Sequence, residues 1–373
     1  MAVEQDIQRT AQARRQTAIS AVRTHLDPLS EDSSASRLRT MIEQGGRPML
    51  VSADIDGVVS ASMLTSVAPD WQIVAFVSRS QELYLHPSVE MERPRDIFGV
   101  DVFSPMFDNV SNHVVLFGGR RLKNLTIREA FQEWDQVVLN ATEERLLAVP
   151  SIWAHTEAGY ESADRPTSAK YKYPLGTAQL LLAMLEVSGS PPRFFDRHYL
   201  PWLVANCDGG VSSFTEHAYN AGIWWPVLAG AVGPGSVTDY IYRRVDEMRP
   251  HDFSRAVDQL DRERGDEDPW LNDKWDMKEP NIRGIKRTIS WLCELTGWPD
   301  PVRDGVQNLD EWIRLPVPST SRGEVYLAGD RKAASFADPE NAALLIKGAQ
   351  GAVNANFYFG GQVGTRFNWV GGW

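Results

Sequence analysis

The chain has 373 residues, of which 43% are hydrophobic and 23% charged, and its formal net charge is −11 at pH 7. This composition is ordinary for a globular protein with a sizeable core, and the length predicts two domains. The acidic balance argues against a large face for duplex nucleic acid, because the duplex is itself a polyanion. The two cysteines do not make a disulfide framework.

Neither a membrane span nor a secretion signal is expected. No uninterrupted apolar run reaches the ~18 residues that a spanning helix needs. The N-terminal stretch MAVEQDIQRTAQARRQ is charged and has no apolar signal core. We therefore expect a cytoplasmic protein that does not associate with membranes.

Two helices are expected before the first strand. Apolar residues recur at helical spacing over residues 4–26, and a second helix over 34–44 stops at Gly45-Gly46. We interpret residues 1–46 as a helical N-terminal arm that caps the domain after it. Oligomerisation through these helices is the alternative role.

From residue 48 onward, short apolar strands alternate with helical segments. The expected strands are 48–53, 71–77, 96–103, 113–117 and 136–139, and a helix is expected at 60–67. This alternation predicts an α/β fold with a doubly wound, mostly parallel sheet and flanking helices. Ligands of such sheets bind at the carboxyl ends of the strands.

The second half of the chain has a looser pattern. A polar loop is expected at 154–173, an apolar helix from Gly176 onward, and a buried segment at 199–208. The AGAVGPGS run near residue 230 predicts a linker. Residues 47–230 then form the α/β domain, and residues 231–373 form a smaller α+β C-terminal domain for substrate binding or interaction.

Three aspartates fall at expected carboxyl ends of strands. Asp54 and Asp56 form an Asp-x-Asp pair followed by Gly57, and Asp101 ends a later strand. Two unpaired carboxylates at one point would repel each other, and a hard divalent cation such as Mg²⁺ or Mn²⁺ removes that problem. The alternative is a pair of solvated acids in an Asp-Gly turn.

The stretch around these acids is similar to a known motif. An apolar strand followed by Asp54-x-Asp56-Gly57-x-x-Ser60 resembles the first motif of the DHH phosphoesterase superfamily, which includes RecJ-type exonucleases, nanoRNases and cyclic-dinucleotide phosphodiesterases. In that family the two aspartates bind metal and the serine opens a helix. The resemblance therefore implies a Mn²⁺ or Mg²⁺ site, with Ser60 close to the substrate.

Weaker matches follow in the family's order and extend the resemblance over residues 48–230. Asp101 looks like the single metal-binding aspartate of the second motif. The apolar helix from Gly176 is similar to the helix that follows the metal motifs, and Asp208 looks like the last metal ligand. The resemblance thus implies four catalytic metal ligands, Asp54, Asp56, Asp101 and Asp208.

The Asp-His-His triplet that names the family is absent. Ser111-Asn112-His113 is one candidate replacement, with His113 as a metal ligand, but it comes at the start of the expected strand. Arg120 and Arg121 lie nearer the end of that strand, where guanidinium groups could bind phosphate. The alternatives are a core or strand-edge histidine and a solvated arginine turn.

A second, faint resemblance lies near the C-terminus. The Gly-rich run from Gly360 to Arg366 is similar to the family's Gly-rich substrate motif without its histidine. Backbone N–H groups in such a loop could cradle a phosphate, with Arg366 supplying positive charge. The alternative is a Gly-rich terminus that packs its aromatic side chains.

Together these patterns predict a metal-dependent phosphodiesterase that acts on nucleotides or short single-stranded oligonucleotides. Two alternatives stay open. One is a catalytically degenerate DHH-like protein that binds a nucleotide or a protein partner. The other is a haloacid-dehalogenase-type phosphatase, in which Asp54 is the nucleophile and Asp56 the acid/base. A homo-oligomer through the N-terminal helices or the C-terminal half is compatible with each of these functions.

Overall fold

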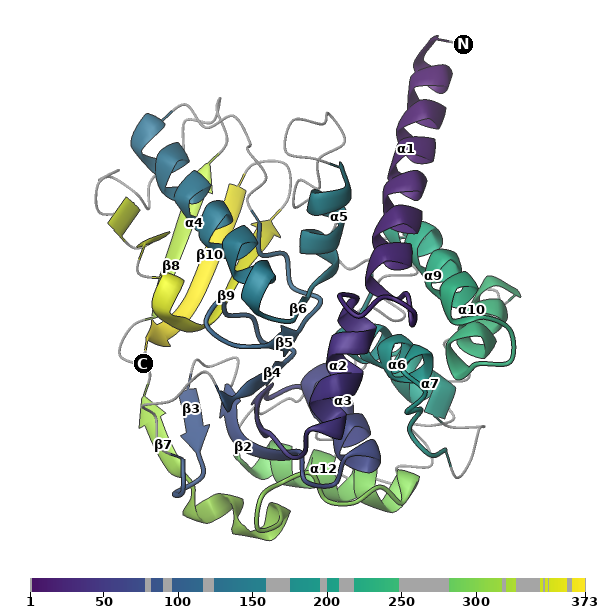
Figure 1. Cartoon of the computed structure of the whole chain (residues 1–373). Helices are drawn as coiled ribbons and strands as arrows, with labels where there is room; N and C mark the ends of the chain where they lie inside the picture. Colours follow the sequence, from purple (N-terminus) through teal and green to yellow (C-terminus); the bar gives the residue numbers. More distant parts are fainter. Residues whose placement is uncertain are drawn as a thin grey trace.

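The structure is a computed structural model of the whole chain. It describes residues 2–77, 82–89, 96–116, 124–158, 175–194, 200–207, 218–247, 282–316, 320–326, 343–344, 346–347, 349–360 and 364–372. Figure 1 shows a central sheet with flanking helices and a second, smaller sheet. Of the helices in these ranges, none is both long enough and apolar enough to cross a membrane.

The central sheet has seven strands in the order β6-β5-β4-β1-β2-β3-β7. The bounds are β1 Pro48–Ser52, β2 Gln72–Val77, β3 Glu82–Leu85, β4 Phe98–Val100, β5 Asn109–Val110, β6 Leu147–Ala148 and β7 Ile313–Pro316. The five strands from β6 to β2 pair in parallel, whereas β3 pairs antiparallel with both β2 and β7. The expected α/β fold with a mostly parallel sheet is therefore confirmed.

Two of the expected strands are wrong. Residues 136–139 lie inside helix α4 (Leu125–Glu144), and the described residues 111–116 form no strand. Val114, Val115 and Leu116 are buried because they pack in one cluster with α4, whose Trp134 Nε1 donates to the Val115 carbonyl oxygen at 2.7 Å. A short buried apolar run has no period that separates a strand from other buried chain, so burial was mistaken for strand pairing.

The N-terminal helices pack on the main core. They are α1 (Ala2–His25) and α2 (Ser34–Glu43), and the far end of α1 extends beyond the neighbouring helices in Figure 1. Ala18, Ala21 and Val22 of α1 are buried in the largest core cluster. The His25 ring also stacks on Trp153 of α5 (Pro150–Ala158), with 4.5 Å between the ring centroids. Helix α5 covers residues 154–158 of the polar loop that we expected there, and residues 159–174 lie outside the described residues.

Helices from the second half of the chain complete the same core. They are α6 (Thr177–Val187), α7 (Leu200–Ala205), α9 (Ala218–Val232), α10 (Val237–Glu247) and α12 (Ile282–Thr296), followed by the 3₁₀ turn η3 (Val306–Glu311). The Gly-rich run expected as a linker, residues 229–236, forms the last four residues of α9 and the turn into α10, and the two helices pack on each other. Residues 237–247 and 282–316, expected in a C-terminal domain, thus contribute helices to this core and strand β7 to the central sheet.

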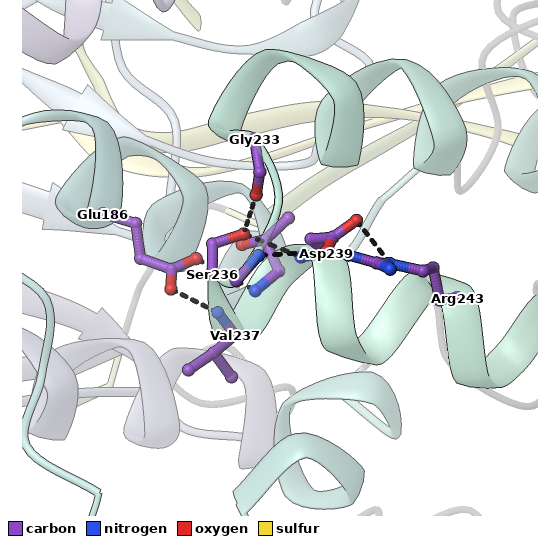
Figure 2. A network of polar contacts seen from close by, with 8 residues as sticks. Glu186, Gly233, Ser236, Val237, Asp239 and Arg243 are labelled. Atoms are coloured by element: carbon purple, nitrogen blue, oxygen red, sulfur yellow. Dashed lines mark hydrogen bonds and ion pairs between the residues drawn. The ribbon is translucent and has the colours of Figure 1, made fainter.

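A carboxylate from α6 holds the start of α10. Glu186 accepts hydrogen bonds from the backbone N–H of Val237 at 2.5 Å and of Thr238 at 2.9 Å. Figure 2 shows this contact beside the turn, where Ser236 Oγ donates to the Gly233 carbonyl oxygen. A negative group is favourable at this point because the first N–H groups of a helix have no partner within the helix.

The small sheet has the order β8-β10-β9, with β8 Thr320–Tyr326, β9 Ala352–Gly360 and β10 Gly364–Gly372. A short 3₁₀ turn, η4 (Ala349–Gly351), precedes β9. The two sheets are linked where Asn354 Oδ1, on β9, accepts a hydrogen bond from the Phe103 backbone N–H at 3.0 Å.

Candidate functional site at the carboxyl edge of the parallel sheet

Asp54 ends the turn from β1 into helix α3 (Ile55–Val67). It is the N-cap of α3: its Oδ1 accepts from Gly57 N–H at 3.0 Å, and its Oδ2 accepts from Ser52 Oγ at 2.7 Å. A Cβ at Gly57 would lie 2.4 Å from the Ser52 carbonyl oxygen, so the turn requires glycine. The cap starts α3 five residues earlier than the expected helix at 60–67.

Asp56 joins α3 to the N-terminus of α6. The side chain lies in the first turn of α3 and is only 1% exposed. Its Oδ2 accepts from Thr177 N–H and its Oδ1 from Ala178 N–H, both at 2.7 Å. Because these two N–H groups are the first of α6, the carboxylate neutralises the positive end of that helix.

Gly176 lets α6 begin this close to its neighbours. A Cβ built there would lie 2.7 Å from the Cys207 carbonyl oxygen and 3.3 Å from Asp56 Oδ2. Cys207 follows α7, and Gln179 Nε2 donates to the Cys207 and Ala205 carbonyl oxygens at 3.5 and 3.2 Å. The chain after α7 is therefore held against the start of α6.

Asp101 reaches the same point from strand β4. It follows Val100, is 2% exposed, and has a left-handed backbone with φ of 55°. Its Oδ1 accepts a hydrogen bond from Thr177 Oγ1 at 2.6 Å. Aspartate tolerates the left-handed region better than most residues, and this conformation ends the strand at the carboxylate.

The Ser111-Asn112-His113 triplet lies at the carboxyl end of strand β5, because β5 is Asn109–Val110. This corrects the expectation that the triplet precedes a strand. Asn112 is buried, and its backbone N–H donates to Thr177 Oγ1 at 3.0 Å. His113 is partly buried next to it, and its carbonyl oxygen accepts from Ser151 Oγ at 3.2 Å. The triplet therefore lies at a strand end, next to the ends of β4 and β1 in the sheet.

Ser60 does not open a helix, because that place belongs to Asp54. It lies one turn beyond Asp56 on α3 and is fully buried, and its Oγ has no hydrogen-bond partner among the described residues. Residues four apart share a helix face, so Ser60 and Asp56 point to the same side of α3. The helix that we expected from residue 60 thus contains Ser60 in its interior.

Four of the predicted residues are not placed at this edge. Arg120, Arg121 and Asp208 lie outside the described residues, although Asp208 directly follows Cys207 in the sequence. Arg366 lies on β10 opposite Glu324 and Tyr358 in the small sheet, and its side chain is outside the described part. Gly360 pairs with Gly364 across the β9–β10 hairpin.

The donor chemistry of the site suits a hard cation. Asp56 and Asp101 are buried carboxylates that both accept hydrogen bonds from Thr177. Oxygen ligands of this kind fit Mg²⁺ or Mn²⁺. Within the described ranges, however, no three His, Cys, Asp or Glu side chains gather as a metal-sized group. The described part of the chain therefore brings two carboxylates, those of Asp56 and Asp101, to Thr177. Asp54 instead caps helix α3.

Thr177 is the site residue that sequence reasoning missed. Its signal was a hydroxyl residue at the first position of a strongly apolar helix, where the first N–H groups need partners from outside the helix. Searches against protein-family models, curated proteins and solved structures found no match to the chain.

Proposed function

We propose that the chain is a metal-dependent phosphodiesterase of the DHH type that acts on nucleotides or short single-stranded oligonucleotides. One observation carries the proposal: Asp56, Asp101 and Asn112, which follow three neighbouring parallel strands, all contact Thr177. Strand ends that converge in a parallel sheet form the usual ligand crevice of α/β proteins. The positions match the order of the motifs that the resemblance implies.

In this proposal Asp56 and Asp101 hold Mn²⁺ or Mg²⁺, and His113 and Asp208 are further ligands. A bound cation would supply Lewis-acid stabilisation of the charge that develops on a phosphoryl group. Asp54 maintains the strand-to-helix turn that places Asp56. The net charge of −11 favours short, flexible substrates over long duplexes, because repulsion grows with the number of phosphates that face the protein.

The finer organisation of the chain belongs to the same proposal. The β8-β10-β9 sheet and the residues around it would form the smaller α+β unit that contacts substrate, with Arg366 and the Gly360–Gly364 hairpin facing phosphate. Arg120 and Arg121 would add positive charge for binding phosphate. The hydrogen bond between Phe103 and Asn354 supports this arrangement, because it ties the small sheet to the loop that follows Asp101.

A second candidate is a catalytically degenerate DHH-like protein that binds a nucleotide or a protein partner. It is favoured by the full use of Asp56, since the fold already employs both carboxylate oxygens at the N-terminus of α6. The phosphatase alternative is supported less well. A nucleophilic Asp54 would have to act from a carboxylate that both caps α3 and accepts from Ser52.

The test combines metal binding with three substrates. The purified chain is titrated with Mn²⁺ by calorimetry and then assayed on 5′-labelled short oligonucleotides, cyclic dinucleotides and p-nitrophenyl phosphate. Asp101→Asn is the site variant, because asparagine tolerates the left-handed backbone and keeps an acceptor for Thr177. Asp70→Asn, at an exposed position, is the matched control.

Diester hydrolysis that requires Mn²⁺, is lost in Asp101→Asn and persists in Asp70→Asn supports the phosphodiesterase. Nucleotide binding without turnover of any diester overturns it and favours the degenerate protein. Turnover of the monoester alone, with a trapped aspartyl phosphate on Asp54, identifies the phosphatase.

A further inference from the structure

Thr177 uses both of its polar groups within the candidate site. It is the first residue of α6 and is fully buried. Its backbone N–H donates to Asp56 Oδ2 at 2.7 Å, and its hydroxyl donates to Asp101 Oδ1 at 2.6 Å. The same hydroxyl oxygen accepts from Asn112 N–H at 3.0 Å. One residue therefore contacts all three strand ends of the site.

The direction of these hydrogen bonds is determined by chemistry. A backbone N–H can only donate, so the Thr177 oxygen accepts from Asn112, and its single hydrogen is left for Asp101. The β-branched side chain is also stiff about χ1, which restricts where the hydroxyl can point. Asp101 Oδ1 is thus held toward α6 while Asp56 is held by the α6 backbone.

We propose that Thr177 is a positioning residue, which sets the orientation of Asp56 and Asp101 as ligands of a divalent cation. This inference rests on the proposed function. Metal ligands are oriented by hydrogen bonds from residues behind them, and the loss of one such partner typically weakens metal affinity by roughly 10–100-fold. Asp56 lies in the first turn of α3 and Asp101 directly follows β4, and Thr177 is a residue that contacts both carboxylates.

A purely structural role would leave a different signature. If Thr177 only fastens α6 to the sheet, removing its hydroxyl lowers the stability of the fold and leaves the metal affinity of the folded protein unchanged. If it positions the ligands, metal affinity falls beyond any change in stability. The measurement must therefore record both quantities on the same variants.

The experiment uses the full chain and Mn²⁺ as the probe. Thr177→Val removes the hydroxyl but keeps the shape and the N–H bond to Asp56, whereas Thr177→Ser keeps the hydroxyl. Thr65→Val is the matched control, because Thr65 is equally buried and its hydroxyl donates to the Trp71 carbonyl oxygen on the far side of α3. Mn²⁺ affinity is measured by calorimetry, and stability by urea unfolding in EDTA.

We expect Thr177→Val to bind Mn²⁺ roughly 10–100-fold more weakly, while Thr177→Ser and Thr65→Val bind with wild-type affinity. Wild-type affinity in Thr177→Val overturns the inference, as does an equal loss in Thr177→Ser. If the valine variant does not fold, Thr177→Ala provides the same comparison. A wild-type chain that binds no Mn²⁺ overturns the proposed function and this inference together, whereas Mn²⁺ binding that is insensitive to Thr177 overturns the inference alone.

Discussion

The carboxylate of Asp56 accepts a hydrogen bond from the backbone N–H of Ala178, 122 residues later in the chain, at 2.7 Å. With the bond from Thr177, this makes Asp56 the anion at the N-terminus of α6. The same arrangement recurs at the other end of that helix, where Glu186 holds the start of α10 (Figure 2). Acidic side chains that bind the first N–H groups of a neighbouring helix thus connect three helices, α3 to α6 and α6 to α10.

Replacing Asp56 by asparagine should destabilise the chain whether or not metal is present. Asparagine keeps one acceptor oxygen but turns an NH₂ group toward a backbone N–H, which leaves a buried donor without a partner. The expected loss is about 1–3 kcal/mol in the free energy of unfolding. Urea denaturation in EDTA measures it, with Asp70→Asn as the exposed control. Equal stability of Asp56→Asn and the wild type would show that the Asp56–α6 contact contributes nothing to the fold.

Gly176→Ala should be destabilising, whereas Gly222→Ala should not. A methyl group at Gly176 would lie 2.7 Å from the Cys207 backbone oxygen, so α6 or the chain after α7 must move, at a cost of about 1–3 kcal/mol. Gly222 lies inside α9 with open space around its Cα, and alanine there should add up to ~1 kcal/mol through helix propensity. Thermal unfolding of both variants checks that the two substitutions change the stability of the fold in opposite directions. A Gly176→Ala protein as stable as the wild type would contradict the close approach.

Glu186→Gln should weaken the start of α10. The amide keeps one acceptor for the N–H groups of Val237 and Thr238, but it loses the negative charge at the helix N-terminus. The expected loss is about 1 kcal/mol, and it should shrink at high salt because the contact is partly exposed. Glu129→Gln, at an exposed position within α4, is the control and should stay within ~0.5 kcal/mol of the wild type. A salt-independent difference between the two variants would argue against the charge as the cause.

The stability of the chain should fall in alkaline solution, in part because of Cys293. Burial, and then the nearby charge of Asp300, raise the pKa of the Cys293 thiol from its ordinary value of 9.0 to about 11. The folded state therefore retains the proton that the unfolded state releases, so this contribution is complete below pH 9 and is lost as the pH rises toward 11. Urea unfolding at several pH values from 8 to 11 should show a steeper loss for the wild type than for Cys293→Ala.

If the free energy of unfolding falls equally with pH in the wild type and in Cys293→Ala, the result would contradict the raised pKa of Cys293. A second measurement follows from the same shift. Because the thiolate is the reactive form, Cys293 should react slowly with a disulfide reagent at pH 8 in the folded protein. Cys207 is fully buried and should be unreactive as well. Both thiols should react at once in denaturant.

Several elements were predictable because they carry local signals. Helices α1, α2 and α12 have apolar residues at helical spacing, and strands β1 and β2 are apolar runs of the right length. The expected strands at 113–117 and 136–139 failed, since burial without periodicity does not distinguish a strand from a packed loop or a helix face. The two-residue strands β5 and β6 are too short for any local pattern to reveal them.

The sequence by itself determined that Asp54 and Asp56 follow β1 and that Asp101 follows β4, because strands, turns and caps depend on neighbours within a few positions. Only the tertiary structure decided that Asp54 serves its own helix while Asp56 and Asp101 meet at Thr177. It also decided that Ser111-Asn112-His113 ends a strand beside them. The reason is physical: the hydrogen bonds that assemble this edge join residues between 65 and 122 positions apart, and no local pattern encodes such contacts.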